Sequence, residues 1–84
     1  MWTEQSNKLY RSFTFKDFKE AFNFISNVAD LANEHNHHPT WSNTYKKVEI
    51  WLSTHDAGDI VTDKDRQLAA AIDEMLLQIE GKKQ

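Results

Sequence analysis

The sequence predicts an α+β fold in which a four-stranded antiparallel sheet carries both of its helices on one face. Two amphipathic segments with helical periodicity, at 14–32 and 62–79, each follow a pair of short extended segments. Short connections within each pair favour hairpins, so the predicted order is β-β-α-β-β-α. The 84 residues, 39% of them hydrophobic, fit a single domain spanning residues 1–84. A domain this small has a thin core, which favours one sheet covered by one layer of helix.

The first hairpin is predicted at the start of the chain. Residues 2–5 are read as a short strand and residues 8–15 as a longer one. Ser6-Asn7 is a plausible two-residue turn because asparagine tolerates a positive φ. The apolar residues of one parity are expected to face the core: Leu9, Phe13 and Phe15. Arg11 shares that parity and interrupts the pattern.

The first helix is predicted to begin at a capping box, Thr14-Phe15-Lys16-Asp17, with Thr14 as the cap. Its end is expected near Glu34 to Asn36, because Pro39 disfavours helical geometry at His38. The apolar positions recur at steps of three and four residues, which predicts one core-facing stripe. These positions are Phe18, Ala21, Phe22, Ile25, Val28, Ala29 and Ala32, widened by Phe24 and Leu31.

The second hairpin is predicted within residues 41–52. Val48, Ile50 and Leu52 alternate and are expected to face the core. Glu49, Trp51 and Ser53 then point to the other face. An outward Trp51 is a candidate subunit contact, and a turn is expected at 57–59.

The second helix is predicted to begin at another capping box, Thr62-Asp63-Lys64-Asp65. Gly81 is a natural helix end, and Lys82-Lys83 complement the helix dipole. The apolar positions again form one stripe. They are Leu68, Ala69, Ile72, Met75, Leu76 and Ile79.

Composition narrows the classes of function. There is no cysteine, so disulfides and thiolate metal sites are excluded. The formal net charge is -3 and the basic residues are scattered, which disfavours direct nucleic-acid binding. No apolar run approaches the roughly 20 residues of a membrane helix, and the first residues do not form a signal peptide. A cytoplasmic location is therefore expected.

Three of the four histidines lie at the two ends of the second hairpin. His37 and His38 are adjacent, so on an extended backbone they point to opposite faces and have different roles. His55 follows a strand, with Asp56 beside it and Asp65 further along. Imidazoles near carboxylates suit acid–base chemistry at neutral pH. From spacing alone, surface or structural histidines remain an alternative, as does a metal site, although adjacent histidines are not a standard ligand spacing. The fourth, His35, is expected to be solvated.

The combination of these motifs resembles one family, the pterin-4a-carbinolamine dehydratases. A tyrosine stands six residues after the proline of His37-His38-Pro39, and a histidine stands ten residues after that tyrosine. A downstream aspartate follows in the same order as in the family. The residues that carry the resemblance are His37, His38, Pro39, Trp41, Asn43, Tyr45, Thr54, His55, Asp56 and Asp65.

The resemblance implies two β-hairpins, each followed by a helix, and dehydration of 4a-hydroxytetrahydropterin to the quinonoid dihydropterin with no metal or organic cofactor. It implies that His37, His38 and His55 are the active-site histidines, with Asp65 as the family's downstream acid. We expect His55 and His37 to be the acid–base pair and His38 to act mainly in binding. The expected pterin-pocket residues are Asn36, Ser53, Thr54 and Asp56, with Pro39 and Trp41 as an apolar wall.

The chain departs from the family at two informative places. Asn33 stands four residues before His37, where the family usually has a charged residue, and an amide cannot accept a proton as a carboxylate does. Asn33 is included in the expected substrate-binding set. The segment before Asp65 is one residue longer than in mammalian members.

The resemblance also implies partners other than the pterin. A homodimer or homotetramer is expected. The alternatives are a non-catalytic oligomerising interaction module, because mammalian members bind and dimerise a homeodomain transcription factor, and a dehydratase-like protein of molybdopterin metabolism.

Overall fold

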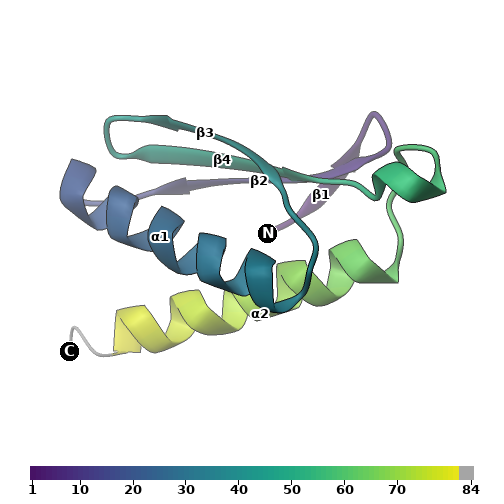
Figure 1. Cartoon of the computed structure of the whole chain (residues 1–84). Coiled ribbons are helices and arrows are strands. Elements are labelled where there is room, and N and C mark those ends of the chain that lie inside the picture. The colour runs from purple at the N-terminus through teal and green to yellow at the C-terminus, as the bar shows by residue number, and fades with distance from the viewer. Residues whose placement is uncertain (82–84) are drawn as a thin grey trace.

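The computed structural model describes residues 1–81 and has the predicted order of elements. The antiparallel sheet has the strand order β1-β2-β4-β3, and both helices cover one face of it (Figure 1). The predicted fold class is therefore confirmed. The elements are β1 (Thr3–Gln5), β2 (Lys8–Thr14), α1 (Phe18–Glu34), β3 (Thr40–Thr44), β4 (Lys47–Leu52), a short 3₁₀ helix η1 (His55–Ala57) and α2 (Asp63–Gly81).

Strand β4 lies between β2 and β3 and alternates as its sequence predicts. Val48, Ile50 and Leu52 are fully buried beneath the helices. Trp51 points to the other face, where its ring lies 5.4 Å from that of its ladder partner Tyr10. The buried apolar side chains of the sheet and of both helices form one core cluster.

The β1–β2 turn and the interrupting arginine both have physical explanations. Ser6 and Asn7 have φ values of 50° and 64°, as a two-residue hairpin turn requires. Arg11 lies on the core face of β2, but its guanidinium donates to Asp73 of α2 at 2.7 Å. The indole Nε1 of Trp2 donates to the same carboxylate at 2.9 Å. The charge of Arg11 is therefore paired at the margin of the core.

The prediction that Thr14 caps α1 is wrong. Thr14 is the last residue of β2 and pairs with Lys47 in the ladder. The cap is Asp17, whose carboxylate accepts from the backbone N–H of Glu20 at 2.9 Å. The carboxylate of Glu20 accepts in turn from the backbone N–H of Lys16 at 3.5 Å. The helix begins three residues later than predicted because sheet pairing holds Thr14 in an extended conformation.

The predicted core stripe of α1 is wrong at two phenylalanines. Phe24 is 1% exposed, whereas Phe18 and Phe22 are 50% and 55% exposed. The buried arc is centred on Ala21 and Val28, and Phe22 lies about 100° round the helix from Ala21. Phe18 and Phe22 instead stack on each other with ring centroids 6.0 Å apart. The helix therefore presents an aromatic pair outside the core.

Helix α2 begins as predicted. The backbone N–H of Thr62 donates to the Asp65 carboxylate at 2.8 Å, which is the reciprocal bond of a capping box. Leu68, Ile72 and Leu76 are buried against the sheet and α1. The predicted role of Lys82-Lys83 at the helix dipole lies outside the described residues. Within residues 1–81, no helix has the length and apolar character needed to cross a membrane.

Candidate active site

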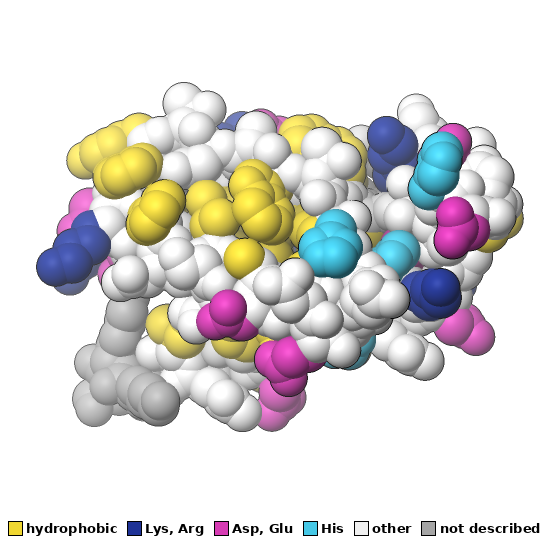
Figure 2. Space-filling view, in the orientation of Figure 1, with side chains coloured by type: hydrophobic (Ala, Val, Ile, Leu, Met, Phe, Trp, Pro, Cys, Tyr) yellow, Lys and Arg dark blue, Asp and Glu magenta, His cyan; other side chains and the backbone are white. Residues whose placement is uncertain are grey.

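A cavity of about 270 Å³ lies where the α1–β3 loop, the end of β4, η1 and the first turn of α2 converge. Its size is just below the range of about 300–1,000 Å³ found for small-molecule pockets. Histidines (cyan) and flanking charged side chains gather on the right half of the face shown in Figure 2. The lining residues are Asn36, His37, His38, Ser53, Thr54, His55, Asp56 and Lys64.

The end of α1 sets the positions of the adjacent histidines. The helix ends at Glu34 with His35 as its C-cap, and Asn36 takes a positive φ of 50° that turns the chain. The backbone N–H of His37 still donates to the carbonyl of Ala32 at 3.0 Å, which ties the loop to the helix. Pro39 then keeps the chain extended.

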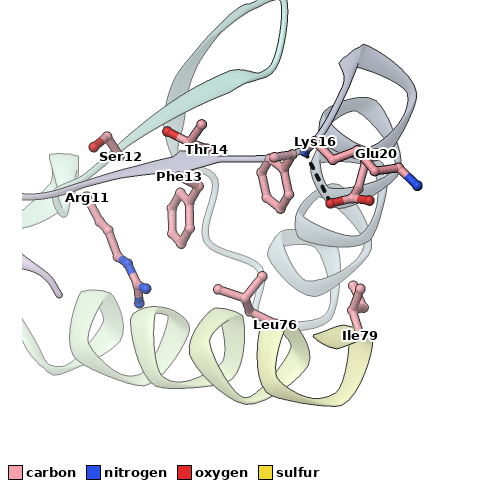
Figure 3. A pocket seen from close by; sticks show the side chains of 9 residues that line it. Arg11, Ser12, Phe13, Thr14, Lys16, Glu20, Leu76 and Ile79 are labelled. Carbon is pink, nitrogen blue, oxygen red and sulfur yellow. Dashed lines mark hydrogen bonds between the residues drawn. The ribbon is translucent and has the colours of Figure 1, made fainter. Parts of the chain in front are cut away.

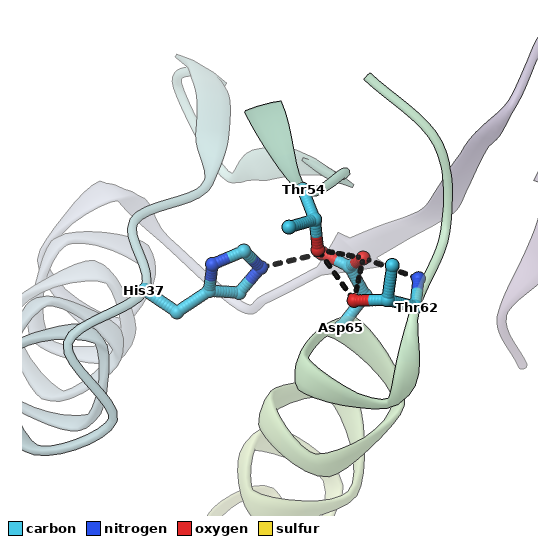
Figure 4. A network of polar contacts seen from close by, with 4 residues as sticks. All are labelled: His37, Thr54, Thr62 and Asp65. Carbon is cyan, nitrogen blue, oxygen red and sulfur yellow. Dashed lines mark hydrogen bonds and ion pairs between the residues drawn. The ribbon is translucent and has the colours of Figure 1, made fainter. Parts of the chain in front are cut away.

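His37 turns inward and meets Asp65. Its Nε2 lies 2.5 Å from Oδ1 of Asp65, and its side chain is only 11% exposed (Figure 4). An ionised carboxylate can only accept a hydrogen bond, so Nε2 is the protonated ring nitrogen. Nδ1, turned away from Asp65 in Figure 4, is then the atom able to accept a proton.

Asp65 is fully buried and well supplied with donors. Its Oδ2 accepts from the hydroxyl of Thr54 and from the backbone N–H of Thr62, each at 2.8 Å. Burial alone would raise the pKa of the Asp65 carboxyl, but the bonds from His37, Thr62 and Thr54 outweigh burial and lower that pKa. Asp65 therefore stays ionised behind His37, and this network weakens only as pH falls through the lowered pKa.

His38 turns outward and meets Asn33. Its Nε2 lies 3.0 Å from Oδ1 of the amide, so Nε2 donates and Nδ1 is unprotonated in the neutral ring. The two adjacent histidines thus have partners of different kinds. His37 faces a buried carboxylate, and His38 faces an exposed amide that carries no charge.

His55 lies at the start of η1 and is strongly exposed. Its Nδ1 is 2.9 Å from Oδ1 of Asp59, which follows the left-handed Gly58. The hydrogen bond from His55 to Asp59, then the charges of Asp59 and Asp56, raise the pKa of His55. His55 therefore remains protonated to a higher pH than a free imidazole does, with Nε2 as its second N–H.

Not every residue predicted for the site lines this cavity. Asp65 is behind His37, and Asn33 is behind His38. Pro39 and Trp41, predicted to form an apolar wall, are absent from the lining. Trp41 is instead 38% exposed on β3, an edge strand of the sheet.

Lys64 and Asp59 were missed by sequence reasoning. Lys64 lines the cavity from the first turn of α2. A cation there opposes the helix dipole, which is a signal that could have drawn attention to it. Asp59 follows His55 by four residues, and the sequence predicts only a turn there.

A second cavity, of about 310 Å³, lies between β2 and the two helices (Figure 3). It is bordered by Arg11, Phe13 and Leu76 and contains no imidazole. Among the side chains that the structure describes, those of residues 1–79, no group of three or more histidines, aspartates or glutamates is placed to hold a metal ion. The histidine-lined cavity therefore has the side chains best suited to acid–base chemistry.

Comparison with known proteins agrees with the sequence resemblance. The family model of the pterin 4 alpha carbinolamine dehydratases matches residues 1–75. A Rhodospirillum rubrum protein named "Putative pterin-4-alpha-carbinolamine dehydratase" is 52% identical over 77 residues, covering 89% of this chain and 79% of that protein. A Rhodopseudomonas palustris protein with the same name is 49% identical over 76 residues, covering 90% and 74%.

Two solved structures are similar in fold. The transcriptional coactivator/pterin dehydratase from Brucella melitensis has a TM-score of 0.82 and 36% identity, covering 87% of this chain and 79% of that one. A pterin dehydratase-like protein described as a RuBisCO assembly factor in the alpha-carboxysome has a TM-score of 0.73 and 26% identity, covering 87% and 86%.

Proposed function

Because the chain belongs to the pterin 4 alpha carbinolamine dehydratase family, we propose that it dehydrates a 4a-hydroxytetrahydropterin to the quinonoid dihydropterin, so that the tetrahydropterin cofactor is recycled. The observation that carries this proposal is the convergence of His37, His38 and His55 on one cavity, each with its own acceptor. In the reaction the C4a–O bond breaks, the hydroxyl takes up a proton and leaves as water, and a ring nitrogen loses a proton as its electron pair forms a C=N bond.

His55 is the proposed general acid. The dehydration needs a proton donor for the leaving hydroxyl, and the raised pKa of His55 keeps its imidazole protonated to a higher pH than a free imidazole. Asp59 holds Nδ1–H, so Nε2–H is the proton available to the substrate. Because His55 is exposed, it can take up a new proton from water after each turnover.

His37 is the proposed general base. Its Nε2–H is held by Asp65, so its bare Nδ1 can take the proton of the pterin ring nitrogen. After the water product leaves, His37 releases its proton to solvent and His55 takes one up, which restores the starting state. No net proton is consumed.

The remaining lining residues are proposed to bind the pterin. His38, Asn36 and Ser53 supply polar groups at the cavity wall, and Asp56 and Lys64 supply charges of opposite sign. Pterins carry a pattern of ring donors and acceptors that such groups can satisfy. Among the side chains of residues 1–79, no hydrogen bond or ion pair is described for Lys64, which leaves its ammonium available to a carbonyl or hydroxyl of the substrate.

The proposed reaction is tested by turnover of chemically generated 4a-hydroxytetrahydropterin, followed by ultraviolet absorbance. We expect the folded protein to accelerate dehydration well above the spontaneous rate. A protein that is folded by circular dichroism yet gives only the spontaneous rate would show that this chain does not catalyse the reaction. A dehydratase-like role on another pterin, such as one in molybdopterin metabolism, would then be tested by substrate binding.

A pH experiment tests the role of His55. Replacing Asp59 with asparagine removes the charge that helps to raise the pKa of His55, while the charge of Asp56 remains. The pKa of His55 should fall toward its ordinary value, and the alkaline limb of the kcat/KM profile should move to lower pH, because the acid loses its proton earlier. The control is Asp30→Asn, which removes an exposed carboxylate from α1. An alkaline limb that stays in place while NMR shows the His55 titration shifted would assign the acid to another group.

A protein-binding role is the second candidate. The aromatic pair Phe18 and Phe22 and the half-exposed Trp41 contribute apolar surface beside the unpaired edge of β3, and Figure 2 shows apolar side chains gathered over α1 and β3. Two similar proteins are named as a coactivator and as an assembly factor. The predicted homodimer or homotetramer would use such surface, and light scattering at micromolar concentration tests it. The histidines of the cavity favour dehydration as the primary function.

A further inference from the structure

Two threonine hydroxyls lie in series beside Asp65, and of the two residues only Thr54 lines the cavity. The Oγ1 atoms of Thr62 and Thr54 are 2.6 Å apart, and Oγ1 of Thr54 donates to Oδ2 of Asp65 at 2.8 Å. The direct distance from the Thr62 hydroxyl to Oδ2 is much longer, 3.5 Å. Each hydroxyl has one hydrogen to donate, so these lengths define an ordered chain in which Thr62 donates to Thr54 and Thr54 donates to Asp65 (Figure 4).

This chain fixes how the Asp65 carboxylate is used. Its Oδ2 accepts from the Thr54 hydroxyl and from the Thr62 backbone N–H, so both donors hold the same oxygen. Oδ1 is left for the Nε2–H of His37. Hydrogen bonds in such a series strengthen one another. They also restrain rotation of the carboxylate, which would worsen the geometry of the hydrogen bond from His37.

We propose that Thr62 and Thr54 are positioning residues that act through Asp65 to hold the proton of His37 on Nε2 and keep its Nδ1 free. The assignment of Nδ1 as the catalytic base rests on the proposed function, whereas the control of the tautomer does not. Thr62 is outside the lining of the cavity. Thr54, which is also expected to bind the pterin, lines the cavity, but it is only 7% exposed and its hydroxyl donates to Asp65.

The tautomer is tested without substrate. In uniformly ¹⁵N-labelled protein at a pH where His37 is neutral, long-range ¹H–¹⁵N spectra should show His37 protonated on Nε2 and bare on Nδ1. Thr62→Val keeps the shape and the backbone N–H but removes the hydroxyl, and it should produce a mixture of the two tautomers. Thr62→Ser restores the hydroxyl and should restore the wild-type spectrum.

The kinetic test separates positioning from binding. Thr62→Val should lower kcat by about tenfold, as loss of a supporting hydrogen bond commonly does, with KM changed less than about twofold because Thr62 does not line the cavity. Thr62→Ser should recover most of the loss. The matched control is Thr44→Val on β3, where the exposed hydroxyl is remote from this chain of bonds. It should leave kcat, KM and the His37 spectrum unchanged.

Each result decides the proposal. A wild-type protein with His37 protonated on Nδ1 would overturn it even if Thr62→Val does not fold. So would a folded Thr62→Val protein with an unchanged His37 tautomer, or one whose loss of activity is entirely a rise in KM. If the wild-type protein fails to dehydrate the pterin but the tautomer responds as described, the proposed reaction fails while the positioning role stands.

Discussion

Replacing His55 with alanine is expected to lower kcat for dehydration by roughly 10²- to 10⁴-fold, the usual contribution of a positioned acid or base. The imidazole has a raised pKa and donates one N–H to Asp59, so its other N–H is the proton source for the leaving hydroxyl. Without it, the leaving hydroxyl loses the proton donor that is positioned for it. KM should change little if His55 acts mainly in the transition state.

The matched control for this variant is His35→Ala. His35 is exposed, ends α1 through its backbone and does not line the cavity. Its replacement should leave both kcat and the unfolding midpoint nearly unchanged. Since His55 has few packing contacts to lose, the two variants should be equally stable. A His55→Ala protein that retains full activity would remove His55 from the mechanism, and one that unfolds would show a structural role.

Replacing Phe24 with alanine is expected to destabilise the protein by about 3–5 kcal/mol, the usual cost of deleting a buried phenylalanine. Phe24 is 1% exposed and contacts the rings of Phe13 and Phe15 at centroid distances of 4.7 and 4.9 Å. Domains have a total stability of about 5–15 kcal/mol, so this loss is a large share of it. Urea unfolding followed by circular dichroism measures it.

Phe22→Ala is the matched control because it is the same change two positions away on the same helix. Phe22 is 55% exposed and its ring contact is with Phe18 on the surface. We expect a loss of less than about 0.5 kcal/mol in the monomer. Equal losses from the two substitutions would mean that α1 is rotated relative to the sheet. A loss for Phe22→Ala that grows with protein concentration would reveal self-association through this face.

Much of the fold was predictable because local signals agreed with the tertiary arrangement. The alternation of Val48, Ile50 and Leu52 matches the two faces of β4, and the Thr62 capping box begins α2. The rotation of α1 was not predictable. Phe22 and Phe24 are equally apolar, and the helical stripe is wide enough to include either. Packing against the sheet selected Phe24.

The candidate site shows the same division. Spacing and resemblance pointed to His37, His38 and His55, and these line one cavity. The hydrogen-bond partners of these histidines depend on which residues the fold brings close, not on their separation along the chain. Asp65 is 28 residues from His37 in the chain, and no local pattern pairs them. Asp59 is only four residues from His55 in the chain. It is the acceptor for His55 because Gly58 and the 3₁₀ turn bring its carboxylate next to the imidazole.

The sequence by itself determined the order of elements, the hairpin faces and the residue types that serve acid–base chemistry, because periodicity, turn residues and caps act over a few neighbouring positions. Tertiary structure decided which carboxylate or amide each imidazole meets, which ring nitrogen is free and which phenylalanines are buried. Those properties depend on contacts between segments that are brought together by burial of the common core. A hydrogen-bond partner and a buried face are therefore properties of the folded chain, not of any one segment.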